Sequence, residues 1–504
     1  MGEATGQKLR SMLGDAAYVA LGSYGTQALS FLINVVLVRK LDLDNYGAYS
    51  VFLTVYSMST LVMSLGAAPI VLRYLPELIA RGNRGGVIRL KRLGAGLHLG
   101  AGLVIIAFCW LFKDALATWL NAPMFAGLLP YFALFTLLQF EASIFEQMLV
   151  AHRSQKFRNL TLMGTQLLKL LLFWLALPQD GSAATVLQFL VLSNGILFLL
   201  MAARALGLTR AVADNVEEPL PWRRLTRYGL LQYTNVMAAS GFLSDIDLAL
   251  IAHYLGAVET GFYRYATTTV YTLCRIVPMH FLLSVLVPVY VADYTRNKDP
   301  EQLKRVFSFY NKVVNGFLAP AFVGTLVLAV PITALIFDPK MLPAVPALRV
   351  FFVGMYITYF LNTTSFLLTI LERPEITLYS RVFVIYNVIM DIVLIPRFGI
   401  MGAAIATSTA IAMGYVFTYF MVKRVIAIRI PWGATLRTFA YCGAMALVVW
   451  LPLRAGWITN VPRLILVVGA GSLVYGLLAW RLPVFTQDER QHLNAALRRR
   501  VFPT

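Results

Sequence analysis

The sequence has 504 residues, of which 59% are hydrophobic and 13% charged, and its formal net charge is +19 at pH 7. A water-soluble domain has about a quarter of its residues charged, so this composition excludes a soluble globular protein. The net charge alone would suit a nucleic-acid-binding protein, but the basic residues lie in short loops between apolar stretches. That placement is typical of a membrane protein whose loop charges set its orientation, and no nucleic-acid partner is expected.

Long apolar stretches recur along the whole chain. A helix crosses the bilayer hydrocarbon with roughly 20 mainly apolar residues. Because lipid offers the backbone no hydrogen-bonding partner, these stretches must be helical. We predict an all-α polytopic membrane protein with about 14 transmembrane helices. Their expected limits are 16–38, 46–68, 93–112, 126–150, 160–178, 183–207, 228–254, 262–291, 310–336, 346–371, 376–396, 400–422, 434–453 and 461–480.

The loops between these spans alternate in charge. One set is basic, as in the loop with Arg89, Lys91 and Arg92, whereas the other set is short and nearly neutral, as at Asp180 and Glu259. Both ends of the chain fall on the basic side. Cytoplasmic loops carry an excess of lysine and arginine. We therefore expect a multi-pass protein of the cytoplasmic (inner) cell membrane, with both termini in the cytoplasm.

Two similar segments indicate an internal repeat. Segment 41–49 follows the first expected span and segment 255–263 follows the seventh, with leucine, glycine and tyrosine coinciding at one constant offset. This repeat predicts two pseudo-symmetric six-helix lobes related about the membrane normal. The expected organisation is an N-terminal lobe at 1–207, a cytoplasmic interlobe linker at 208–227, a C-terminal lobe at 228–425, two additional spans at 426–480 and a cytoplasmic basic tail at 481–504.

Motifs of membrane-bound enzymes are absent from the sequence. It contains no Gly-rich phosphate loop ending in Lys-Ser or Lys-Thr, no His-Glu-x-x-His and no Gly-x-Ser-x-Gly. Its three cysteines lie far apart in apolar segments, without the spacing of metal ligands. We therefore expect a protein that is not an enzyme, with no catalytic residue, no metal site and no cofactor.

Basic residues inside the expected spans are candidates for substrate binding, because a charge at bilayer depth is costly and calls for a reason. Lys169 and Arg275 are the main candidates for the wall of a cationic cavity. Arg39 and Arg73 are weaker candidates, because both lie near span ends where they also set topology. Glu141 and Lys169 are expected at the same depth, roughly 20 Å along their helices, where they either form a structural ion pair or act in transport.

Acidic residues inside the spans are candidates for ion coupling. They are Glu141, Glu146, Asp245 and Asp247. The last two are two positions apart and point about 200° apart around a helix, so only one of them can face a given cavity. Asp391 lies near the outer end of its span, where snorkelling of the side chain to the interface is an adequate explanation.

Several short segments carry a family resemblance. Segments 32–41 (Leu-Ile-Asn-Val-Val-Leu-Val-Arg-Lys-Leu) and 45–50 (Asn-Tyr-Gly-Ala-Tyr-Ser) resemble the opening of Wzx-type lipid-linked oligosaccharide flippases, and so does segment 65–77. Segments 254–263 and 371–374 look like their second-lobe counterparts. These flippases form the polysaccharide-transporter branch of the multidrug/oligosaccharidyl-lipid/polysaccharide exporter superfamily. The resemblance implies two six-helix lobes around a central cavity and alternating access.

The resemblance also implies a substrate. The family moves oligosaccharide repeat units on a polyprenyl pyrophosphate from the cytoplasmic to the outer leaflet, for surface polymers such as O-antigen or exopolysaccharide. It implies a monomeric transport unit in contact with membrane lipids, with polysaccharide assembly proteins as candidate partners. Three alternatives stay open: an ion-coupled small-molecule or drug exporter of the same superfamily, a flippase for the peptidoglycan precursor, and a membrane-bound polysaccharide polymerase or ligase.

Overall fold

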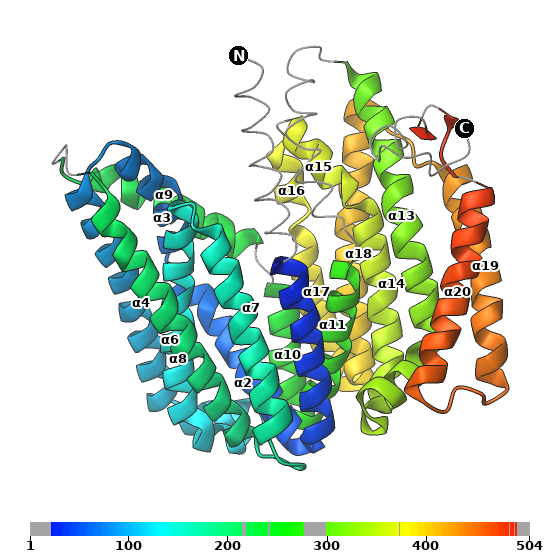
Figure 1. The fold of residues 1–504 in the computed structure, drawn as a ribbon, viewed down its shortest axis with the longest axis horizontal. Helices are drawn as coiled ribbons and strands as arrows, with labels where there is room; N and C mark the ends of the chain where they lie inside the picture. Colours follow the sequence, from blue (N-terminus) through cyan, green and yellow to red (C-terminus); the bar gives the residue numbers. More distant parts are fainter. Residues whose placement is uncertain are drawn as a thin grey trace. The chain divides into compact units, whose positions relative to one another are not determined.

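The computed structural model describes residues 22–213, 218–239, 242–276, 299–371, 373–482, 484–487 and 489–490. Every labelled element in these ranges is a helix (Figure 1). The expected all-α class is therefore confirmed. The chain divides into two compact units, Met1–Gly261 and Phe262–Thr504. The expected lobe, linker and tail boundaries stay predictions.

The first unit is a bundle packed around α6, which contacts α8 and α4 most extensively. Its buried apolar cluster draws on α3, α4, α6 and α8 and includes Val71, Leu75, Ile144 and Met148. The elements of this unit are a helix at 22–40, α2 (Leu43–Met63), α3 (Ala67–Ala80), α4 (Arg84–Leu111), α5 (Lys113–Trp119), α6 (Met124–Ala151), α7 (Gln155–Leu171), η1 (Leu172–Ala176), α8 (Ala183–Gly207), η2 (Leu208–Ala211), α9 (Trp222–Ala239) and α10 (Phe242–Leu255).

The expected span 46–68 is divided into α2 and α3 by a break at Leu65 and Gly66. Both residues have left-handed backbone conformations, with φ of 40° and 72°, and glycine adopts such a conformation at no steric cost. A Cβ built on Gly66 would collide with the carbonyl group of Gly229 in α9. The break therefore brings the backbones of α3 and α9 into direct contact, while α2 packs against α10.

The second unit is built on helix pairs. α14 and α17 pack on α18, and α13 and α20 pack on α19; the last two helices, at the orange-to-red end of the colour scale, lie side by side (Figure 1). The elements are α11 (Ala257–Ile276), which begins in the first unit, α13 (Pro300–Pro331), η3 (Ile332–Phe337), η4 (Pro339–Ala344), α14 (Val345–Leu361), α15 (Thr363–Ile370), α16 (Pro374–Tyr379), α17 (Val382–Phe398), α18 (Ile400–Ile426), α19 (Trp432–Arg454) and α20 (Val461–Arg481).

Ten helices in the described ranges are long and apolar enough to cross a membrane. They include α19 and α20, the two spans expected beyond the repeat. The polytopic membrane class is therefore confirmed, whereas the count of fourteen stays a prediction. Part of the eighth expected span, 262–291, lies outside the described residues, and so do the basic chain ends at 8–10 and 498–500.

Candidate functional site

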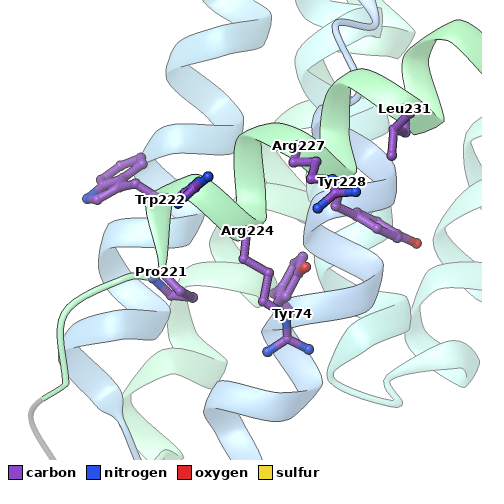
Figure 2. A pocket seen from close by; sticks show the side chains of 8 residues that line it. Tyr74, Pro221, Trp222, Arg224, Arg227, Tyr228 and Leu231 are labelled. Atoms are coloured by element: carbon purple, nitrogen blue, oxygen red, sulfur yellow. The ribbon is translucent and has the colours of Figure 1, made fainter.

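A cavity of about 710 Å³ in the first unit combines arginine and aromatic side chains (Figure 2). We call it the arginine pocket. It is formed by the start of α9 together with α3, and its lining residues are Tyr74, Pro221, Trp222, Arg223, Arg224, Arg227, Tyr228 and Leu231. None of the arginines that line this pocket is predicted as a site residue from the sequence, because basic residues near a span end also serve to set topology.

Aromatic packing holds the walls of the arginine pocket together. The Tyr74 ring meets the Tyr228 ring edge to face, with centroids 5.6 Å apart. The Arg224 guanidinium lies 5.2 Å from the centroid of the Tyr74 ring, within the range of a cation–π interaction. In Figure 2, Arg224 and Tyr74 lie beside each other, and Arg227 and Tyr228 follow along α9.

Arg73, a predicted substrate-binding residue, lies beside this pocket and is ion-paired. Its Nη1 is 3.1 Å from Glu77 Oε2. The same carboxylate lies 2.9 Å from Arg81 and 3.7 Å from Arg224. Glu77 therefore neutralises part of an arginine cluster rather than one residue, and Arg73 remains about half exposed, with 49% of its side-chain surface accessible.

Lys169 lies in the last turn of α7, inside the candidate span Gln155–Ala176. The ion pair with Glu141 does not form: in the described ranges no hydrogen bond or ion pair involves Lys169, and Glu141 Oε1 is buried without a hydrogen-bond partner. Equal depth along two consecutive helices does not bring these residues together, because α6 packs mainly against α8 and α4 and only sparsely against α7.

Glu146, a predicted ion-coupling residue, bonds to Arg158 at the start of α7. Arg158 Nε donates to Glu146 Oε1 at 2.8 Å, and Nη2 donates to the same oxygen. Arg158 also donates to the Asn159 side chain at 2.9 Å. The pair ties the end of α6 to the start of α7, which gives Glu146 a structural function whether or not it also takes part in coupling.

Asp245 and Asp247 lie in different environments on α10. Asp245 accepts a hydrogen bond of 2.7 Å from Ser57 of α2 and lines a mainly apolar cavity of about 310 Å³. Asp247 is fully buried. Their different environments follow from their opposite directions around the helix. The cavity also contains Trp119, Phe108 and Leu116.

Arg275 and Arg39 are both exposed. Arg275 lies near the end of α11, in the second unit, where its charge is close enough to the Tyr359 hydroxyl to interact electrostatically with it. Arg39 lies near the end of the helix at 22–40 in the first unit. The predicted cationic residues therefore belong to both units: Lys169, Arg39 and Arg73 to the first and Arg275 to the second.

Asp391 corrects a sequence-based expectation. It does not snorkel to the interface: its side chain is fully buried, and its Oδ2 accepts a 2.8 Å hydrogen bond from Asn387, one turn earlier on α17. α17 packs on α18. On α18, Thr407 forms a buried hydrogen bond of 3.1 Å with Tyr263 of α11. Asparagine and aspartate four residues apart on an apolar helix are the signal that would have predicted this buried polar face.

In the part of the chain that the structure describes, no group of three or more histidine, cysteine, aspartate and glutamate side chains is arranged to hold a metal ion. The three cysteines are buried as free thiols.

The apolar spans and the two helical units define a multi-pass α-helical membrane protein. This chain belongs to the family of polysaccharide biosynthesis proteins, whose model matches residues 12–292. The match confirms the family resemblance found in the sequence. Because it covers more than half of the chain, it does not depend on any single motif.

Two relatives are from Haloferax volcanii. The chain is 30% identical to probable flippase AglR over 127 residues, which cover 25% of this chain and 27% of the relative. It is 23% identical to probable low-salt glycan biosynthesis flippase Agl15 over 268 residues, which cover 49% of this chain and 53% of the relative. The chain therefore spans about a quarter and about half of these relatives' lengths.

The structure resembles that of the lipid II flippase MurJ in its inward closed conformation. The TM-score is 0.71 and the identity 13%, with 95% of this chain and 99% of that chain covered. At such low identity the likeness concerns the fold. It extends over nearly the whole chain.

Proposed function

We propose that this protein is a flippase for an anionic lipid-linked oligosaccharide, with polyprenyl pyrophosphate as the lipid carrier. The substrate would pass from the cytoplasmic to the outer leaflet by alternating access, for the synthesis of a cell-surface polysaccharide. The names of the two Haloferax relatives, both probable flippases, support the activity. The family description supports the link to polysaccharide synthesis.

One observation carries the proposal: Lys169 is a cation at membrane depth that has no acidic partner in the described ranges. A lysine in that environment is costly, and a structural role would call for a carboxylate beside it. A pyrophosphate would supply the missing anion during transport. Arg275, exposed on α11, is the second proposed pyrophosphate ligand, and Arg39 and Arg73 are secondary ones.

The acidic residues inside the expected spans support a return of the empty carrier that is coupled to the movement of an ion. Among the candidates Glu141, Glu146, Asp245 and Asp247, we favour Glu141, whose buried Oε1 has no hydrogen-bond partner. Protonation removes the cost of holding such a carboxylate at membrane depth. The protein would act as a monomer in the cytoplasmic membrane, with both termini in the cytoplasm and with polysaccharide assembly proteins as neighbours.

The test is depletion of the protein in its own cells, followed by mass analysis of extracted polyprenyl-pyrophosphate-linked sugars. A membrane-impermeant label reports the leaflet that holds them. We expect accumulation in the cytoplasmic leaflet. Unchanged amounts would contradict a flippase, whereas accumulation in the outer leaflet would indicate a later step, such as the reaction of a polymerase or ligase.

A second candidate function is export of a lipophilic cation. The observation that favours it is Asp245, a carboxylate in a mainly apolar cavity of the first unit. A carboxylate surrounded by apolar side chains suits an amphipathic cation. Depletion would then leave the lipid-linked sugars unchanged and raise the cellular retention of a lipophilic cationic dye. Replacing Asp245 by Asn would reproduce that retention.

A further inference from the structure

Arg223 and Arg227 are the two arginines of the arginine pocket that have no anionic partner among the described residues. They lie four residues apart on α9 and therefore on the same face of the helix. No ion pair or hydrogen bond of either side chain occurs in the described ranges. Arg224 differs, because it lies over Tyr74 and 3.7 Å from Glu77. Two guanidinium groups are thus available to an incoming anion.

The charge of the surroundings strengthens the attraction for an anion. Arg73 and Arg81 lie next to the pocket and share Glu77. The second nearby carboxylate, Glu218, is ion-paired with Arg81 at 3.2 Å. Among the described residues, five arginines (Arg73, Arg81, Arg223, Arg224 and Arg227) lie at or beside the pocket with two carboxylates, Glu77 and Glu218. In this described set the arginines outnumber the carboxylates, which favours the binding of an anion.

The pocket is built on a rigid support. Leu225, on the buried side of α9, is 1% exposed. A Cβ on Gly229 would lie 2.5 Å from Ile70 Cδ1 of α3, so the two helices are in close contact. Edge-to-face packing of Tyr74 against Tyr228 adds a second point of attachment. A support of this kind lowers the ordering cost of binding.

The apolar part of the pocket favours a lipid over a soluble anion. Trp222 and Leu231 are 53% and 55% exposed, and they are separated along α9 by roughly 14 Å at 1.5 Å per residue. Trp222 lies shortly before the expected span 228–254, and an exposed tryptophan beside a span end is typical of the membrane–water interface. A phosphate would lie at Arg223 and Arg227, and an acyl or prenyl chain would continue along Leu231.

We propose that the arginine pocket binds the phosphate group of a membrane lipid through Arg223 and Arg227. Arginine is suited to this role because its planar guanidinium forms paired hydrogen bonds with phosphate oxygens. The phosphate has two sources with the same chemistry, namely a phospholipid headgroup and the pyrophosphate of a polyprenyl carrier. Binding at this pocket goes beyond the proposed transport site, which uses Lys169 and Arg275.

The test uses the purified full-length protein in phosphatidylcholine nanodiscs. These contain a small fraction of phosphatidic acid in one series and of polyprenyl pyrophosphate in the other. Native mass spectrometry measures the anionic lipid that remains bound. We expect R223Q/R227Q to weaken retention about tenfold or more, because two charge-assisted contacts are lost. R424Q/R429Q is the charge-matched control: both positions are exposed, at and beyond the end of α18, and wild-type retention is expected.

Each outcome has one meaning. Reduced retention of both lipids in R223Q/R227Q supports the site with phosphate from either source, and reduced retention of polyprenyl pyrophosphate alone identifies the carrier as its ligand. Retention equal to that of R424Q/R429Q for both lipids overturns the proposal. Retention does not require transport, so a protein that binds lipid phosphate but moves no lipid-linked sugar would contradict only the proposed function.

A folding control distinguishes a loss of lipid binding from a loss of the folded structure. R223K/R227K preserves the charges and removes the paired hydrogen-bond geometry, so intermediate retention is expected. All variants are compared by thermal unfolding in the same nanodiscs. If R223Q/R227Q does not fold, the single variant R227Q replaces it. In that case the proposal is overturned when folded R227Q and folded R223K/R227K both retain the two lipids as well as the wild type does.

Discussion

Gly47 and Gly261 pack against each other, although they belong to different copies of the repeated segment. A Cβ on Gly261 would lie 3.3 Å from the Cα of Gly47, and one on Gly47 would lie 2.5 Å from the carbonyl oxygen of Ala257. The two glycines occupy equivalent positions in segments 41–49 and 255–263. The pattern that revealed the repeat therefore marks a place where two backbones meet and a side chain has no room.

Replacing Gly47 by Ala should destabilise the protein. The added methyl group would meet backbone atoms of Ala257 and Val258, which cannot move as a side-chain end can, and we expect a loss of roughly 1–3 kcal/mol. Gly96→Ala is the matched control, because nothing lies within 4 Å of its Cβ and alanine favours a helix interior. Thermal unfolding of both variants in detergent checks this. Equal unfolding temperatures would show that the contact at Gly47 is looser than described.

Replacing Lys169 by Met should abolish transport and leave stability unchanged or higher. No hydrogen bond or ion pair in the described ranges is lost with the ammonium group, and a charge is removed from membrane depth. Lys40→Met should instead lower stability and leave transport intact, because Lys40 Nζ donates hydrogen bonds to the carbonyl groups of Trp174 and Leu177. Flipping in proteoliposomes and thermal unfolding measure the two effects. Normal flipping by the Lys169 variant would remove it from the proposed site.

Replacing Glu146 by Gln should lower stability by roughly 1 kcal/mol, because a partly exposed ion pair with several hydrogen bonds is broken. The variants Glu146→Gln, Arg158→Met and their combination form a double-mutant cycle. We expect a coupling energy above about 0.5 kcal/mol between them. The pH profile of transport should stay that of the wild type, and a shifted profile would instead support Glu146 in ion coupling.

His152, in the turn after α6, should make stability depend on pH. Burial, followed by the nearby Lys91 charge, lowers the pKa of His152 from 6.5 to about 4. Between these values the unfolded chain binds a proton that the folded protein does not, so this contribution to stability falls as pH decreases from about 6.5 to about 4. His152→Gln should flatten the dependence of unfolding temperature on pH in that range, and an unchanged slope would contradict the assignment.

The sequence alone determined the membrane class, the helical structure and the family. Each of these depends on local properties, since about 20 apolar residues must form a helix in lipid whatever lies beside them. The extra helices α19 and α20 were predicted for the same reason. Breaks inside a span, such as the one at Leu65 and Gly66, were missed, because hydropathy does not report backbone angles.

Only the tertiary structure decided which charged side chains meet. Glu141 and Lys169 share a depth but not a contact, because α6 packs chiefly on helices other than α7. Glu146 bonds to Arg158, and Asp391 is buried beside Asn387. The arginines of α9 form a pocket only because α3 brings Tyr74 beside them. Such contacts depend on how each helix is rotated and which helix lies next to it, and these follow from packing between segments far apart in the chain.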